Sequence, residues 1–127
     1  MAKNINRSVS TTNKSAGTIT IDDFGGLSLY LESYKGEPTL RYNQGTYSSY
    51  VVELQHELNI IHDSGFSDSY LIKHIDEDGY FGSDTLSDVK ALQAFSFIGG
   101  EDYCAELTQD GIVGQYTWGK LNMLANE

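Results

Sequence analysis

The same eight-residue phrase occurs twice in the second half of the chain. Residues 78–85 and 110–117 both read Asp-Gly-x-x-Gly-x-x-Thr, where x stands for any residue. Asp-Gly is typical of a tight turn, because glycine adopts backbone angles that are closed to other residues. The closing threonine, Thr85 or Thr117, falls in the first turn of a helix, where unpaired N–H groups need acceptors. The repeat therefore predicts two equivalent turns, each leading into a helix.

Apolar residues at helical spacing flank both turns. A first helix is predicted between an N-cap at Ser48 or Ser49 and a break at Gly65. Two further helices are predicted over residues 83–95 and 115–125. The residues expected on the buried faces of the three helices are Val51, Leu54, Leu58, Ile61, Leu86, Val89, Leu92, Phe95, Trp118, Leu121 and Leu124. Short helices joined by Asp-Gly turns indicate a compact helical bundle.

The residues that carry a family resemblance lie in three blocks. They are Leu40, Arg41, Gly45, Val51, Leu54, Gln55 and Leu58, then Asp78, Gly79, Phe81, Gly82, Thr85, Val89 and Gln93, then Asp110, Gly111, Val113, Gly114, Thr117, Trp118 and Leu121. In this order they resemble the three-helix peptidoglycan-binding domain family. The resemblance spans about residues 39–125. The chain departs from the family pattern in its longer segments 59–77 and 96–109, and in Leu92-Gln93, where the family has Phe-Gln.

The residues before this region have a different character. Residues 1–17 are polar and basic, which predicts a flexible arm. Residues 18–38 alternate apolar and polar side chains around a turn at Asp22–Gly26, which predicts a β-hairpin. The expected fold is mostly α: a compact three-helix peptidoglycan-binding-like bundle at 39–127 with an N-terminal β-hairpin appendage.

The charge of the chain narrows the possible partners. The net charge is −10, and all of it falls within residues 39–127. Nucleic acid is an unfavourable partner, because binding it requires neutralisation of phosphates. No apolar run is long enough to span a bilayer, and no secretory signal is evident, so we expect synthesis in the cytoplasm. A wall-binding protein of this kind would reach the periplasm or wall by lysis or specialised secretion.

The sequence favours neither a metal centre nor catalysis, and we expect no cofactor. Residues 74–79 resemble part of a calcium loop, but His74 and Thr85 stand where two acidic ligands are required. The only cysteine, Cys104, has no histidine close to it in sequence. The many carboxylates offer no distinguished pair for glycoside hydrolysis. We therefore expect a protein that is not an enzyme.

Uncharged and aromatic residues around the two turns are the candidate ligand-binding residues. A shallow site for peptidoglycan or muropeptide requires aromatic platforms and side chains that form hydrogen bonds. The candidates are Tyr80, Gln93, Gln115, Tyr116 and Trp118. Trp118 also suits the core, as do Phe81 and Val113. The resemblance implies a non-catalytic peptidoglycan-binding module that targets a partner hydrolase or delivery machine to the wall.

Tyrosines and acidic charge support a second hypothesis. Five tyrosines fall within residues 30–50, and tyrosine is enriched at protein interfaces. Together with the acidic surface, they suit a protein partner. The alternative function is a protein–protein interaction module, such as an adaptor, an inhibitor or a structural component of a phage or secretion system, which keeps the fold without binding the wall.

Overall fold

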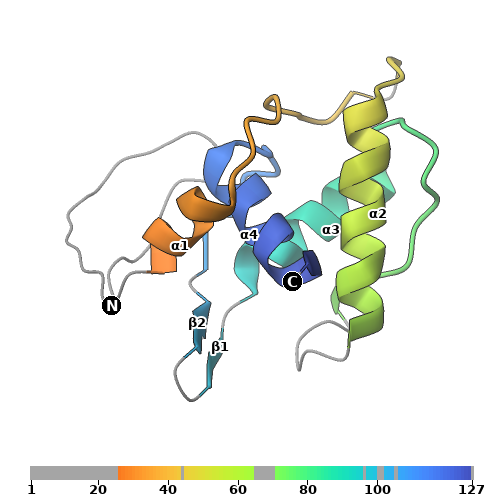
Figure 1. Ribbon diagram of the computed structural model, residues 1–127. Coiled ribbons are helices and arrows are strands. Elements are labelled where there is room, and N and C mark those ends of the chain that lie inside the picture. Colours follow the sequence, from red (N-terminus) through yellow and green to blue (C-terminus); the bar gives the residue numbers. More distant parts are fainter. Residues whose placement is uncertain are drawn as a thin grey trace.

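A computed structural model describes residues 26–43, 45–64, 71–95, 97–99, 102–104 and 106–126. The described chain is mostly helical (Figure 1), as predicted. Its helices are α1 (Gly26–Ser33), α2 (Ser49–Ser64), α3 (Ser83–Ala94) and α4 (Gln115–Asn126), and its strands are β1 (Phe97–Gly99) and β2 (Asp102–Cys104). No helix in this described part is both long and apolar enough to cross a membrane.

Helix α2 begins and ends where the sequence indicates. The Ser48 hydroxyl accepts a hydrogen bond from the Tyr50 N–H at 3.1 Å, and the Ser48 carbonyl accepts from the N–H groups of Val51 and Val52. Ser48 therefore caps the helix, as one of the two predicted alternatives. The helix stops at Ser64, the residue before the predicted break. Its predicted apolar face is buried, at Val51, Leu54, Leu58 and Ile61.

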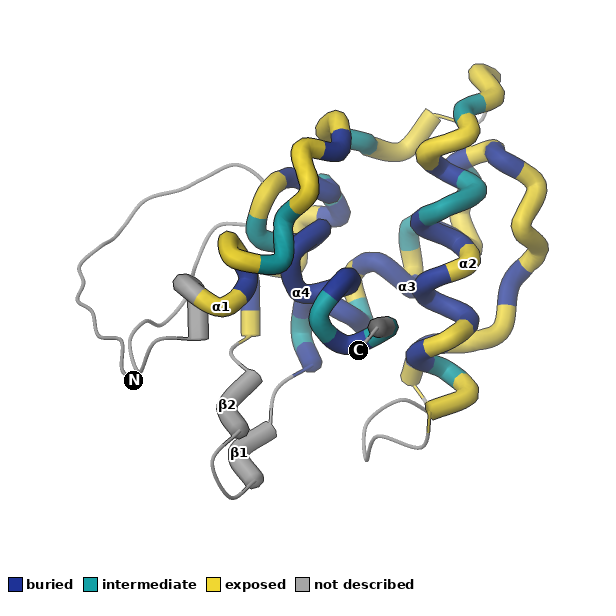
Figure 2. The backbone as a smooth tube through the Cα atoms, viewed as in Figure 1, coloured by how far each residue is buried: buried dark blue, intermediate teal, exposed yellow. Residues whose placement is uncertain are grey.

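Helices α3 and α4 also follow the predicted bounds to within one residue. Val89, Leu92 and Phe95 from the second helical segment are buried, and Leu86 is half-buried. Trp118, Leu121 and Leu124 are buried in α4. Figure 2 shows the buried faces of α2, α3 and α4 turned toward one another, which places a single core between the three helices.

The prediction of a β-strand at residues 27–31 is wrong, because this segment lies in helix α1. Residues 18–25 of the predicted hairpin lie outside the described residues. The alternating leucines suggested a strand, but Leu29 and Leu31 are exposed, and the fully buried residue between them is Tyr30. One buried tyrosine and the close approach of α1 to α4 override the local alternation, because strand preference depends on packing.

A glycine permits α1 to pack on α4. A Cβ atom at Gly119, in α4, would overlap the backbone carbonyl of Tyr30, in α1. The two backbones therefore touch at this point, where only glycine fits. The contact continues beyond α1, because the Asn122 side-chain amide donates to the Ser33 carbonyl at 2.8 Å and to the Glu37 carboxylate at 2.9 Å.

An extended segment joins α1 to α2 and crosses both Asp-Gly turns. We call residues 34–43 and 45–48 the strap; it runs along the top of the molecule in Figure 1. Leu40 forms an antiparallel bridge with Val113, and Asn43 forms one with Phe81. The Trp118 indole N–H donates to the Pro38 carbonyl at 2.7 Å. The strap thus holds the two turns beside each other.

A short hairpin interrupts the segment between α3 and α4. Strands β1 and β2 pair antiparallel, with Ile98 opposite Tyr103. The Lys120 ammonium, fully buried in α4, donates to the carbonyls of Gln93 and Phe95 just before this hairpin. A cation at the carboxyl end of α3 complements the partial negative charge of the helix terminus.

Candidate functional site

The two Asp-Gly turns have the same backbone design. Gly79 has φ 83° and Gly111 has φ 76°, both in the left-handed region that favours glycine. In each turn the aspartate carboxylate accepts a hydrogen bond from the N–H group two residues further on, at 3.0 Å. The sequence repeat is therefore a structural repeat.

A buried glutamine from α2 holds the first turn. The Gln55 side-chain N–H₂ group lies 3.1 Å from the Asp78 carboxylate, 3.0 Å from the Tyr80 carbonyl and 3.0 Å from the Thr85 hydroxyl. Its side-chain oxygen accepts from the Gly79 N–H at 2.9 Å. One side chain thus connects the start, the middle and the end of the repeated phrase.

Gln93 holds the second turn in the same way. Its N–H₂ group lies 3.1 Å from the Asp110 carboxylate, 3.0 Å from the Ile112 carbonyl and 3.2 Å from the Thr117 hydroxyl, and its oxygen accepts from the Gly111 N–H at 2.9 Å. Each helix therefore fixes the turn that precedes the next helix. The repeated threonines lie in the first helical turn, as predicted, and their hydroxyls accept from these glutamines.

The surroundings of the two turns differ. The second turn is covered by α3, because a Cβ atom at Gly111 would lie 2.5 Å from Leu86 and 3.4 Å from Lys90. The first turn is covered by the Tyr47 ring, which a Cβ atom at Gly79 would overlap. Tyr47 in turn meets the Tyr80 ring edge to face, with ring centroids 5.9 Å apart.

A groove of about 410 Å³ opens beside the first turn and the start of α3. Its lining residues are Gln55, Ile75, Asp76, Asp78, Tyr80, Gly82, Ser83, Asp84 and Thr85. The groove is polar and acidic, with no lysine or arginine among these residues. It can offer an aromatic ring, hydroxyls and carboxylate acceptors to a ligand, which suits recognition of hydroxyl, amide and amine groups.

Hydrogen bonds keep the acidic rim ionised. The Tyr80 backbone N–H and then the Gln55 amide lower the pKa of Asp78. The Asn59 amide is the main cause of the lowered pKa of the neighbouring Glu77, and His56 adds to it. Both groups are therefore carboxylates at neutral pH. No cluster of three or more potential ligands is placed to hold a metal ion within the described ranges.

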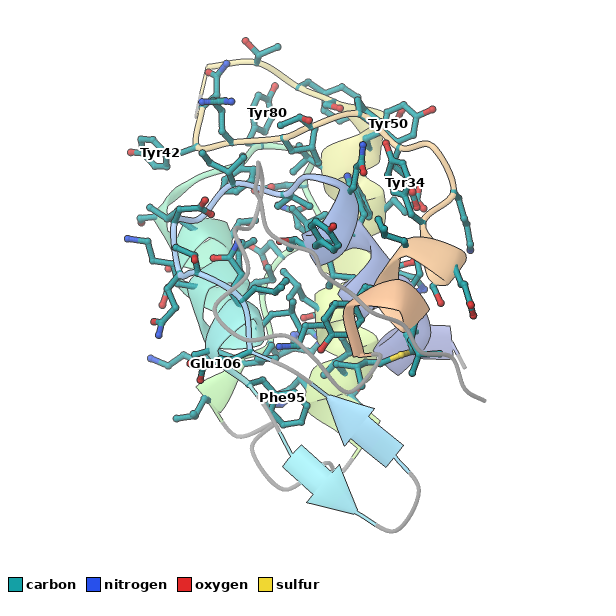
Figure 3. The ribbon with its side chains drawn as sticks, turned by 90° about the vertical axis from the view of Figure 1, so that its left-hand side faces the viewer. Tyr34, Tyr42, Tyr50, Tyr80, Phe95 and Glu106 are labelled. Atoms are coloured by element: carbon teal, nitrogen blue, oxygen red, sulfur yellow. The ribbon has the colours of Figure 1, made fainter. Side chains whose placement is uncertain are left out.

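Four tyrosines of the strap, α2 and the first turn are exposed. Tyr42 is 48% exposed, Tyr47 57%, Tyr50 44% and Tyr80 44%. Figure 3 shows Tyr42, Tyr50 and Tyr80 at the end of the molecule where the strap runs, with Phe95 and Glu106 toward the opposite end. Such large side chains, only half-covered, form a surface with both apolar area and hydroxyl groups.

The five predicted ligand-binding residues do not share one surface. Tyr80 lines the groove. Gln115 is exposed at the start of α4, and Tyr116 is half-buried, with its pKa raised by burial. Gln93 and Trp118 are fully buried, and their polar atoms bond to the protein itself. They therefore support the fold rather than present a surface.

Several groove residues were missed by the sequence reasoning. The carboxylates of Asp76, Asp78 and Asp84 line the groove, and Tyr47 packs beside it. Asp78 is a fixed position of the repeated phrase, which was assigned only to the turn. Tyr47 lies far from Tyr80 in sequence, and its position depends on the bridge between Asn43 and Phe81. The local sequence contains no signal for that bridge.

Two buried carboxyl groups outside the groove, Glu57 and Asp88, have raised pKa values. Burial is the main cause that raises the pKa of Glu57 to about 7, and Glu53 adds to it. Burial likewise raises the pKa of Asp88 to about 6. The Lys73 backbone N–H donates to this carboxylate at 2.9 Å and lowers the pKa, but burial has the larger effect. One oxygen of each carboxyl group has no hydrogen-bond partner among the residues that the structure describes. These groups make stability depend on pH.

Comparison with known proteins adds no assignment: no family model, no curated protein and no solved structure matches the chain. The function therefore has to be inferred from the site. The groove beside the first turn is lined by Asp78, Tyr80, Gly82 and Thr85 from that copy of the repeat.

Proposed function

We propose that this protein is a non-catalytic peptidoglycan-binding module, in keeping with its resemblance to the three-helix peptidoglycan-binding domains. The observation that carries the proposal is the groove at the first turn, where Tyr80 and Tyr47 stand beside the Asp78 carboxylate. Aromatic rings pack against the apolar faces of sugars. Carboxylates accept hydrogen bonds from sugar hydroxyls and peptide amides. A glycan carrying short peptides presents all of these groups together.

The acid chemistry of the groove favours binding over hydrolysis. A glycosidase requires one carboxyl group with a raised pKa to protonate the leaving group. The pKa of Asp78 is lowered instead. Within the described part of the chain, the two carboxyl groups with raised pKa values, Glu57 and Asp88, are not groove residues. The module would serve by bringing a partner hydrolase or delivery machine to the wall.

Replacing Tyr80 by alanine is expected to weaken binding to insoluble, protein-free peptidoglycan by about tenfold, which corresponds to 1.4 kcal/mol. The reason is the loss of the exposed ring in the groove. The measurement is co-sedimentation over a range of peptidoglycan concentrations, with the supernatant checked for released fragments. Gln115→Ala, in the same assay, tests whether the start of α4 contributes.

Tyr50→Ala is the matched control for that experiment. Tyr50 and Tyr80 are both 44% exposed, but Tyr50 does not line the groove. We expect Tyr50→Ala to bind like the unchanged protein. Equal losses in both variants would mean that the groove is not the binding site, and release of soluble fragments would contradict a non-catalytic function.

A protein partner remains the second candidate function, and the acidic rim with its exposed tyrosines favours it. Glu77 and Asp78 are ionised beside Tyr80, and Tyr42 and Tyr47 are exposed nearby. A basic protein surface would complement this charge. Absence of pelleting at low and at moderate salt, together with salt-sensitive binding of one defined basic protein, would favour an adaptor, an inhibitor or a structural component.

A further inference from the structure

We propose that Gln55 is a positioning residue for the groove: through its side-chain amide it sets the orientation of Asp78 and the path of the chain at Tyr80. This inference rests on the proposed function, because it assigns a role in ligand binding to a groove-lining residue whose side chain is almost wholly covered by the protein. Gln55 is 1% exposed. It therefore acts on binding through the groups that it holds.

The hydrogen bonds of Gln55 fix the wall of the groove at three places. The amide N–H₂ group contacts the Asp78 carboxylate, the Tyr80 carbonyl and the Thr85 hydroxyl, and all three of these residues line the groove. Without this amide, the Asp78 carboxylate would keep only the Tyr80 N–H as a partner among these contacts. Its rotation would then be less restricted, because one of these two hydrogen bonds is lost.

Order in the free protein contributes to affinity. A binding surface that is already ordered loses less conformational entropy when its ligand arrives. The Tyr80 ring depends on the same support, because its backbone carbonyl is one of the atoms that Gln55 holds. Loosening this point of the chain would move both the aromatic and the acidic group that the ligand meets.

The second half of the repeat supplies an internal control. Gln93 forms the same hydrogen bonds to Asp110, Gly111, Ile112 and Thr117, and it is 0% exposed. It does not line the groove, and its turn is closed by Leu86 and Lys90. Removing either amide disturbs one turn to a similar degree, but only the Gln55 turn borders the proposed ligand site.

The test compares Gln55→Met with Gln93→Met in the full chain. Methionine keeps the length of the side chain and removes its hydrogen bonds. Both variants are expected to lower the melting temperature to a similar extent. Binding to peptidoglycan, measured well below both melting temperatures, is expected to fall about tenfold in Gln55→Met and to stay within about twofold of the unchanged protein in Gln93→Met.

A second variant separates positioning from stability. In Gln55→Glu the carboxylate still accepts from the Gly79 N–H but cannot donate to Asp78. Burial and the neighbouring carboxylate raise the pKa of such a group, so mild acid returns one donor. We expect the binding of Gln55→Glu, relative to the unchanged protein at each pH, to recover between pH 8 and pH 5. Binding of Gln55→Met is expected to show no such recovery.

Each outcome has a separate meaning. If the unchanged protein does not pellet with peptidoglycan, the proposed function fails and this inference fails with it. If the unchanged protein pellets and Gln55→Met binds peptidoglycan with the same affinity, only the positioning role of Gln55 is overturned. Equal losses of binding in Gln55→Met and Gln93→Met would also overturn it, because the effect would then follow stability.

Discussion

Replacing Gly119 by alanine is expected to lower the free energy of unfolding by about 3 kcal/mol, the upper part of the range for overpacking. The added Cβ atom would overlap the backbone carbonyl of Tyr30. Because that neighbour is backbone, no change of side-chain rotamer relieves the overlap, and α1 has to move away from α4. Tyr30, fully buried in the native arrangement, would then be partly exposed.

Urea unfolding followed by circular dichroism measures this change, and Gly45→Ala is the control. A Cβ atom at Gly45 would meet the Asn43 side chain at 3.7 Å, an ordinary contact, and Gly45 is exposed. We expect Gly45→Ala to change the unfolding free energy by less than about 0.5 kcal/mol. Equal stability of Gly119→Ala and the unchanged protein would contradict the close packing of α1 on α4.

Stability is expected to decrease as the pH rises from 4.5 to 8. Glu57 has an ordinary pKa of 4.5 and a pKa of about 7 in the folded protein, and Asp88 rises from 3.8 to about 6. In this pH range the unfolded chain has already released these protons while the folded protein retains them. The free energy of unfolding therefore decreases as the pH rises, and the decrease is complete above the folded pKa values.

The expected decrease is about 2 kcal/mol for the two groups together, since solvent screening reduces the full value that the shifts imply. Two other carboxylates act in the opposite direction. The lowered pKa values of Glu77 and Asp78 contribute stability that is present above their ordinary pKa values of 4.5 and 3.8 and is lost as the pH falls through the lowered values. Maximum stability is therefore expected at mildly acidic pH.

Glu57→Gln tests the larger shift. A neutral side chain at this position cannot ionise beside Glu53 and Glu37, so we expect it to be more stable than the unchanged protein at pH 8, by about 1 kcal/mol. Urea unfolding at several pH values measures the slope, which should become shallower. Glu32→Gln, at an exposed position in α1, should leave the slope as it is. An unchanged slope in Glu57→Gln would contradict burial of this carboxyl group.

The sequence predicted α2, α3 and α4 well because each carries a continuous apolar face next to a recognisable boundary. Ser48 supplies the cap of α2, and the two Asp-Gly phrases lead into α3 and α4. Helix α1 was missed, since its short segment alternates leucine with other residues and its position depends on contact with Gly119 in a distant part of the chain.

The site was predicted only in part. Tyr80 occupies a variable position of the repeated phrase and does line the groove. The role of Gln55 and Gln93 had a visible signal, since each follows a leucine and precedes an Asp-Gly turn. Their distances to those turns differ in sequence, from Gln55 to Asp78 and from Gln93 to Asp110, so the equivalence emerges only from the hydrogen bonds.

The strap has a consequence for how this chain is made. Pro38 accepts a hydrogen bond from Trp118, which lies 80 residues later, and Ser33 accepts one from Asn122, 89 residues later. During translation the strap therefore leaves the ribosome long before α4 exists to receive it. Contacts between distant residues also slow folding, because the intervening chain must be closed into a loop first. The nascent chain lacks these contacts until α4 has been made, a period in which chaperone contact is favoured.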